Sequence, residues 1–252
     1  MPGIEVTADV AHQIGARGFH FVGGSRFRLD SAHARSLADF ARAWRELPTD
    51  RYLPDGAVYR RRRHARFLLD TRTGALTRDT AGGYLQSKEA NPLTGGMVRH
   101  FAPLLDDQAE NRFLRGLVRA NAEIFGRCAR TVPEVWSVEV HVIRVVTSGG
   151  TATLPSPEGR HRDGFDYIAL HHMDRENVVG GASEVYDPGG SLLVRRTYTA
   201  RLDSLYADDA RVLHDVTPVL PRDDGLPGHR DMLLTSYTGT RPATGPSVRA
   251  GR

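Results

Sequence analysis

The sequence contains a single cysteine, Cys128, among its 252 residues. One thiol cannot form a disulfide within the chain, and it cannot build the multi-thiolate clusters that hold structural zinc or iron–sulfur centres. A metal site in this chain would therefore use histidine, aspartate or glutamate. The sequence offers 11 histidines and 30 acidic residues for that purpose.

Lysine is almost absent too, because Lys88 is the only one and arginine supplies the rest of the 34 basic side chains. The formal net charge of +4 would suit a nucleic-acid-binding protein. However, the arginines are spread along the chain among acidic residues, and we find neither interleaved aromatic and basic residues nor a helix-turn-helix pattern. We therefore expect no nucleic-acid partner. The one arginine run, residues 60–63, is interpreted as the solvated face of a strand.

Long hydrophobic runs are also missing. No segment approaches the roughly 18 apolar residues of a membrane helix, and residues 1–18 lack the apolar run of a signal peptide. With 40% hydrophobic and 25% charged residues, the composition is that of a globular protein and excludes intrinsic disorder of the whole chain. We expect a cytoplasmic protein without a membrane partner. The length is compatible with one domain over residues 1–252.

The hydrophobic pattern divides the chain into a first part rich in helices and a second part rich in strands. Apolar residues recur at helical spacing in residues 31–47 and 106–130, on either side of a predicted β-hairpin (55–78) and a long loop (82–104). From residue 132 the spacing changes to alternation, and short strands follow one another up to residue 239. This order predicts an α+β, mainly β fold in which a helical buttress (about 30–130) supports an antiparallel sandwich or barrel (about 132–240). Residues 241–252 are expected to form a frayed tail.

Three His-x-Asp motifs stand in the strand-rich part, at His161, His172 and His229, where chance would give roughly one. Non-haem Fe(II) is commonly held by two imidazoles and one carboxylate, and residues i and i+2 of a strand project to the same side. His172 lies within an apolar strand, where a hydrogen-bonded core histidine is expected, and His229 would need a third ligand from upstream. His161 follows a turn and precedes Gly164, so it lies at the mouth of a strand and is the best placed of the three.

Two further residues complete this pattern downstream. His214 follows Asp163 by 51 residues, and three or so short strands between them are enough to bring the chain back beside His161 in a double-stranded β-helix. Arg230 lies at the start of the last predicted strand. A buried arginine is well suited to bind a carboxylate through two parallel hydrogen bonds.

At these residues the sequence resembles the Fe(II)- and 2-oxoglutarate-dependent dioxygenases, in particular the bacterial branch that hydroxylates free L-amino acids such as L-isoleucine and L-leucine. The resemblance rests on the segments HRDGFDYIALHHMDRENVVGGASEVYD, VLHDVTPV and HRDMLLTSY, and covers about residues 58–237. It implies a double-stranded β-helix, that is, a jelly-roll, cupin-like barrel. Many members of the wider superfamily carry serine two positions after the arginine, whereas this chain has Met232, so the second donor to the cosubstrate stays unassigned.

The resemblance implies that His161, Asp163 and His214 bind Fe(II), that 2-oxoglutarate is chelated beside them with Arg230 on its distal carboxylate, and that O2 takes the last position. The products would be succinate, CO2 and a hydroxylated free L-amino acid of the isoleucine or leucine type. Candidate substrate contacts are Gln86, Asn91, Arg99 and Glu184, whose loops can cover the barrel mouth. Of His141 and Arg144, at most one can face the cavity.

Several alternatives remain at this point. The same ligands would serve a cupin-like metal enzyme without redox chemistry, such as an isomerase or lyase. The same oxidant would serve a hydroxylase of a peptidyl or carrier-bound residue, and it would also serve desaturation or sulfoxidation. A relative without catalytic activity is a further alternative. The sequence leaves open the exact amino acid, the carbon oxidised and the oligomeric state, a homodimer included.

Overall fold

The structure is a computed structural model that describes residues 3–240, and the predicted tail at 241–252 lies outside them. A sheet of seven antiparallel strands forms its centre, in the order β2-β11-β7-β14-β6-β4-β5. Its strands are β2 (Phe19–Val22), β4 (Arg60–Asp70), β5 (Leu76–Asp79), β6 (Val135–Thr147), β7 (Tyr167–Glu176), β11 (Ser204–Asp208) and β14 (Gly228–Thr240).

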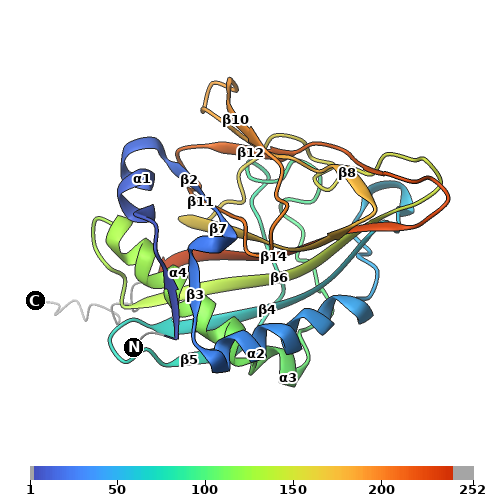
Figure 1. The fold of residues 1–252 in the computed structure, drawn as a ribbon. Coiled ribbons are helices and arrows are strands. Elements are labelled where there is room, and N and C mark those ends of the chain that lie inside the picture. The colour runs from blue at the N-terminus through green and yellow to red at the C-terminus, as the bar shows by residue number, and fades with distance from the viewer. Residues whose placement is uncertain (1–2, 241–252) are drawn as a thin grey trace, which may run out of the picture.

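Shorter strands lie over one face of this sheet (Figure 1). They form a three-stranded sheet, β10-β9-β12, and a two-stranded sheet, β13-β8, all antiparallel. Their bounds are β8 (Val178–Gly180), β9 (Ser183–Tyr186), β10 (Leu192–Arg196), β12 (Leu213–Val216) and β13 (Val219–Pro221). Two layers of antiparallel strands, with the chain passing repeatedly between them, confirm the predicted jelly-roll barrel.

Helices cover the other face of the large sheet (Figure 1). The α-helices are α1 (Val10–Arg17), α2 (Ser31–Phe40), α3 (Asp106–Ala109) and α4 (Arg112–Cys128). The described chain also contains three short 3-10 helices and a small antiparallel sheet. The 3-10 helices are η1 (Gly24–Arg26), η2 (Ala41–Glu46) and η3 (Pro54–Gly56), and the sheet pairs β1 (Ile4–Val6) with β3 (Phe27–Leu29). No helix in this part of the chain is both long enough and apolar enough to cross a membrane.

Alternation along β6 explains how the layers meet. Trp136, Val138, Val140 and Val142 are fully buried and belong to one apolar core with α4 residues such as Phe113. The intervening residues point to the opposite face, where His141 and Ile143 line a cavity beneath the shorter strands. A second, smaller apolar core, which includes Ile168 and Val185, packs between the two layers of strands beside this cavity. The large sheet is thus buried on both faces.

Two parts of the fold differ from the expectation. Residues 4–29 form strands as well as a helix, and β2 lengthens the large sheet by pairing with β11. Five strands, β7 to β11, separate Asp163 from His214, rather than three or so. The two strands that were not predicted are β8 and β11. β8 has only three residues and β11 is buried almost throughout, so neither shows the alternation by which a strand is recognised in a sequence.

Candidate metal centre

A short antiparallel bridge joins His161 to His214 of β12. The backbone N–H of each residue donates to the carbonyl of the other, at 3.1 and 2.9 Å. Opposed residues of antiparallel chains project to the same side, and the two imidazole centroids lie 4.4 Å apart. The backbone pairing therefore brings together two histidines that are 53 positions apart in the sequence.

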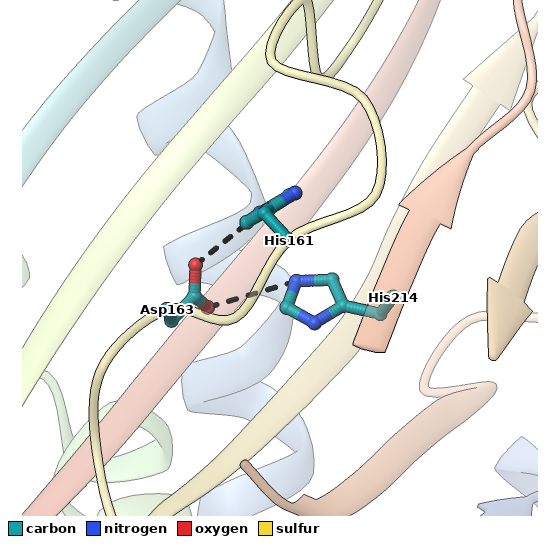
Figure 2. Close-up of side chains that lie close together, drawn as sticks. All are labelled: His161, Asp163 and His214. Atoms are coloured by element: carbon teal, nitrogen blue, oxygen red, sulfur yellow. Dashed lines mark ion pairs between the residues drawn. The ribbon is translucent and has the colours of Figure 1, made fainter. Parts of the chain in front are cut away.

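Asp163 points between these two rings (Figure 2). Its Oδ1 lies 3.5 Å from His161 Nε2 and its Oδ2 lies 3.8 Å from His214 Nε2. One ligand atom from each of the three residues lies within 4.8 Å of the other two. Two imidazole nitrogens and one carboxylate oxygen converging from one side are the donor set of a facial triad, which fits a divalent transition metal.

The protonation of the centre also fits a cation. His161 Nδ1 lies 2.7 Å from the Gly159 carbonyl, to which its N–H donates, so Nε2 is the atom directed at Asp163. Burial opposes charge on both side chains, yet their hydrogen bond raises the pKa of His161 to about 9 and, with the charges of the two histidines, lowers that of Asp163 to about 2. Burial and the charge of His161 lower the pKa of His214 to about 4. The ion pair thus holds a proton that a metal ion would replace.

Asp209, just after β11, stabilises the loop that carries Asp163. Its carboxylate accepts hydrogen bonds from the backbone N–H groups of Asp163, Gly164 and Phe165, at 3.1, 2.6 and 3.0 Å. The residue is 1% exposed, and burial together with the charge of Asp163 raises its pKa to about 6. Asp209 was not predicted from the sequence, because nothing local distinguishes it from its neighbour Asp208.

Arg230 lies in the same cavity as the three converging residues. It is 3% exposed, its Nε and Nη2 have no hydrogen-bond partner among residues 3–240, and burial lowers its pKa to about 10. The hydroxyls of Ser183 and Tyr198 are likewise buried without a hydrogen-bond partner in the described chain. Burial raises the pKa of the Tyr198 hydroxyl, and the charge of Arg230 opposes that rise. Met232 offers no hydrogen-bond donor here, whereas Ser183 lines the same cavity as Arg230.

The other predicted contacts divide into two groups. Gln86, Asn91 and Arg99 line the cavity, as does His141, whereas Arg144 lies on the opposite face of β6. Glu184 does not line the cavity, because its carboxylate is bound by the Tyr186 hydroxyl and by Arg195. The proposal of Glu184 as a substrate contact is therefore wrong.

The interpretation of residues 60–63 as a solvated face is also wrong for half of the run. Arg60 and Arg62 are 9% and 6% exposed and line the cavity, while Arg61 is exposed on the other face of β4. Asp50 accepts from both buried arginines. A strand face exposed to solvent and a strand face that lines a polar cavity give the same alternating pattern of polar residues. The sequence of the arginine run therefore did not reveal which of the two faces Arg60 and Arg62 occupy.

The remaining His-x-Asp motifs do not join this centre. His172 is buried and hydrogen-bonded to the Ala200 carbonyl, as expected of a core histidine. His229, Asp174 and Asp231 form a second cluster, but both carboxylate oxygens of Asp231 are bound by Arg144, at 2.7 and 2.6 Å.

Comparison with known proteins agrees with this geometry. The family described as 2OG-Fe dioxygenase matches residues 41–236. The chain is 24% identical to 3(1)-hydroxy-L-isoleucine 4-dioxygenase of Pantoea ananatis, over 91% of this chain and 95% of that protein. It is 23% identical to L-isoleucine-4-hydroxylase of Bacillus thuringiensis, over 94% and 97% of the two chains.

Solved structures show the same fold. A bsmA homolog from Methylobium petroleophilum superposes with a TM-score of 0.84 at 32% identity, covering 94% of each chain. The structure of IDO from Bacillus thuringiensis superposes with a TM-score of 0.77 at 19% identity, covering 96% of this chain and 98% of that one. The chain belongs to the 2OG-Fe dioxygenase family, as its resemblance predicted.

Proposed function

We propose that this protein hydroxylates a free aliphatic L-amino acid, using Fe(II), 2-oxoglutarate and O2. The observation that carries the proposal is one cavity that contains both the converging His161, Asp163 and His214 and the buried, unpaired Arg230. Family membership supplies the reaction class, and the names of the two curated relatives support the substrate class.

In this proposal His161, Asp163 and His214 hold Fe(II), and Arg230 binds the distal carboxylate of 2-oxoglutarate, assisted by the Ser183 and Tyr198 hydroxyls. The bound metal, with 2-oxoglutarate and O2, supplies the oxidising power, and 2-oxoglutarate leaves as succinate and CO2.

The protein holds and orients these groups. Gly159 fixes the ring of His161, and Asp209 fixes the backbone that carries Asp163. The apolar side chains Ile143, Leu170 and Leu234 line the cavity and keep water away from an aliphatic side chain.

We also propose that residues 1–252 act as a single domain in the cytoplasm, where 2-oxoglutarate and free amino acids are available. Both layers of strands contribute to the one cavity, so neither half of the chain can form the site alone.

The test is turnover of purified protein with Fe(II), 2-oxoglutarate and a panel of amino acids, followed by succinate release and by mass spectrometry of the amino acid. We expect succinate coupled to the gain of one oxygen atom by an aliphatic amino acid, and neither with a His161→Ala control. Oxygen gained only by a peptide or carrier-bound residue would replace the proposed substrate class. Metal binding without any succinate would favour the non-redox cupin-like alternative.

A further inference from the structure

A second basic group, formed by Arg62, Arg99 and His141, lines the cavity apart from Arg230. All three side chains are buried, with exposed fractions of 6%, 3% and 3%. The guanidinium carbons of both arginines lie over the Phe101 ring, at 3.8 and 5.5 Å from its centroid. Contact with the Phe101 ring therefore fixes the positions of the two guanidinium groups.

The hydrogen bond between Arg62 and His141 fixes the tautomer of the histidine. Arg62 Nη2 lies 2.7 Å from His141 Nδ1, and a guanidinium can only donate, so Nδ1 must accept. Burial and the charge of Arg62 hold the pKa of His141 well below its ordinary value, so the ring is neutral. Its single proton is therefore on Nε2.

This assignment leaves three buried donors without an acceptor. Arg62 Nε, Arg99 Nε and His141 Nε2 have no hydrogen-bond partner within the described chain. Leaving a buried donor unsatisfied is costly, and more so for a charged group. Asp50 forms ion pairs with both Arg60 and Arg62. Its single negative charge therefore does not balance the positive charges of Arg60, Arg62 and Arg99. An anion bound between these donors would satisfy both the hydrogen bonds and the charge.

Gln86 attaches this basic group to the metal centre. Arg99 Nη2 donates to Gln86 Oε1, and Gln86 Nε2 donates to the Asp163 carbonyl at 2.9 Å. The backbone bridge between Tyr84 and Arg99 closes the loop that carries both Gln86 and Arg99. An anion bound here is therefore held beside the residue expected to bind iron.

We propose that Arg62, Arg99 and His141 bind the carboxylate of the substrate, so that the enzyme accepts only residues with a free carboxyl group. The inference rests on the proposed function and narrows its substrate class. An amide or thioester carries no charge to pair with the arginines, and its amide nitrogen or sulfur cannot accept in place of a carboxylate oxygen. A residue whose carboxyl group is joined to a peptide or a carrier is thus excluded by this group.

The experiment compares free acids with their primary amides by anaerobic calorimetry, in protein containing Fe(II) and 2-oxoglutarate. L-Isoleucine and L-leucine are each paired with L-isoleucinamide and L-leucinamide. The variants are Arg62→Gln and Arg99→Gln, which lie on different segments, so that one remains informative if the other does not fold. Arg61→Gln is the matched control, since it makes the same change one residue away, at an exposed position on the other face of β4.

We expect the unmodified protein to bind the better acid about 10- to 100-fold more tightly than its amide, the effect of hydrogen bonds to a charged group. This preference should disappear in Arg62→Gln and Arg99→Gln and persist in Arg61→Gln. Equal binding of acid and amide, or no binding of either acid, would overturn the inference.

The visible absorbance of the Fe(II)–2-oxoglutarate complex distinguishes a failure of the proposed function from a failure of the proposed carboxylate site. If both variants lose this absorbance, the basic group binds the cosubstrate and the inference is wrong. If the unmodified protein never shows it, while the acids bind with the expected preference, the proposed function fails and the carboxylate site stands.

Discussion

Gly181, between β8 and β9, offers a test of the role of Arg230 that leaves the arginine itself intact. Its φ is +65°, and a Cβ at this position would lie 3.0 Å from Arg230 Cδ and 3.0 Å from Val219 Cγ2. Ordinary contacts of a Cβ are 3.4–4 Å, so Gly181→Ala would displace the stem of Arg230 by a few tenths of an ångström. The guanidinium would no longer be in position for a carboxylate.

Two effects of Gly181→Ala must be separated. A non-glycine residue with positive φ costs about 1 kcal/mol or slightly more, which lowers the Tm of a chain of this size by roughly 2–4 °C. Partial loss of charge-assisted hydrogen bonds, each contributing about 1.5–3 kcal/mol, should raise the KM for 2-oxoglutarate about 10-fold. Gly149→Ala is the matched control, because its φ is +62° and nothing lies within 4 Å of the added Cβ.

The assays are thermal unfolding, the KM for 2-oxoglutarate from succinate release, and the Kd from the absorbance of the anaerobic Fe(II) complex. Both variants should lose similar stability, and only Gly181→Ala should bind 2-oxoglutarate more weakly. If the two variants have the same KM and Kd for 2-oxoglutarate, Arg230 does not bind this cosubstrate as proposed.

Three further predictions concern other parts of the molecule. Asp209→Ala leaves three backbone N–H groups near Asp163 without their acceptor and should weaken Fe(II) binding about 10- to 100-fold in a metal titration, whereas Asp208→Ala should not. Burial lowers the pKa of His171 to about 3, so below pH 6.5 the unfolded chain gains a proton that the folded chain excludes. In urea unfolding, the free energy of unfolding should therefore fall between pH 7 and pH 5 by about 2 kcal/mol less in His171→Gln than in the unmodified protein. Arg230→Met should raise the KM for 2-oxoglutarate about 100-fold while metal titration shows unchanged Fe(II) affinity, and a parallel loss of metal would contradict its separate role.

Local patterns in the sequence were enough to predict the architecture and to single out the residues that converge in the cavity. The change from helical spacing to alternation near residue 132 separated α4 from β6, because each element buries one repeating face. The spacing of His161 and Asp163 placed two side chains on one side of the chain. With one cysteine available, histidine and carboxylate were the ligand types to search for.

Other features depend on contacts between distant segments, and only the tertiary structure decided them. Arg62 has the alternation of a solvated strand, but the shorter strands above it make its face the wall of a cavity. The sequence does not distinguish Asp209 from other aspartates, and only the fold brings its carboxylate to the backbone of Asp163. Likewise, only the fold brings Ser183 into the cavity that contains Arg230. A sequence records which side of a strand a residue occupies, but whether that side meets water, a core or a ligand depends on what packs over it.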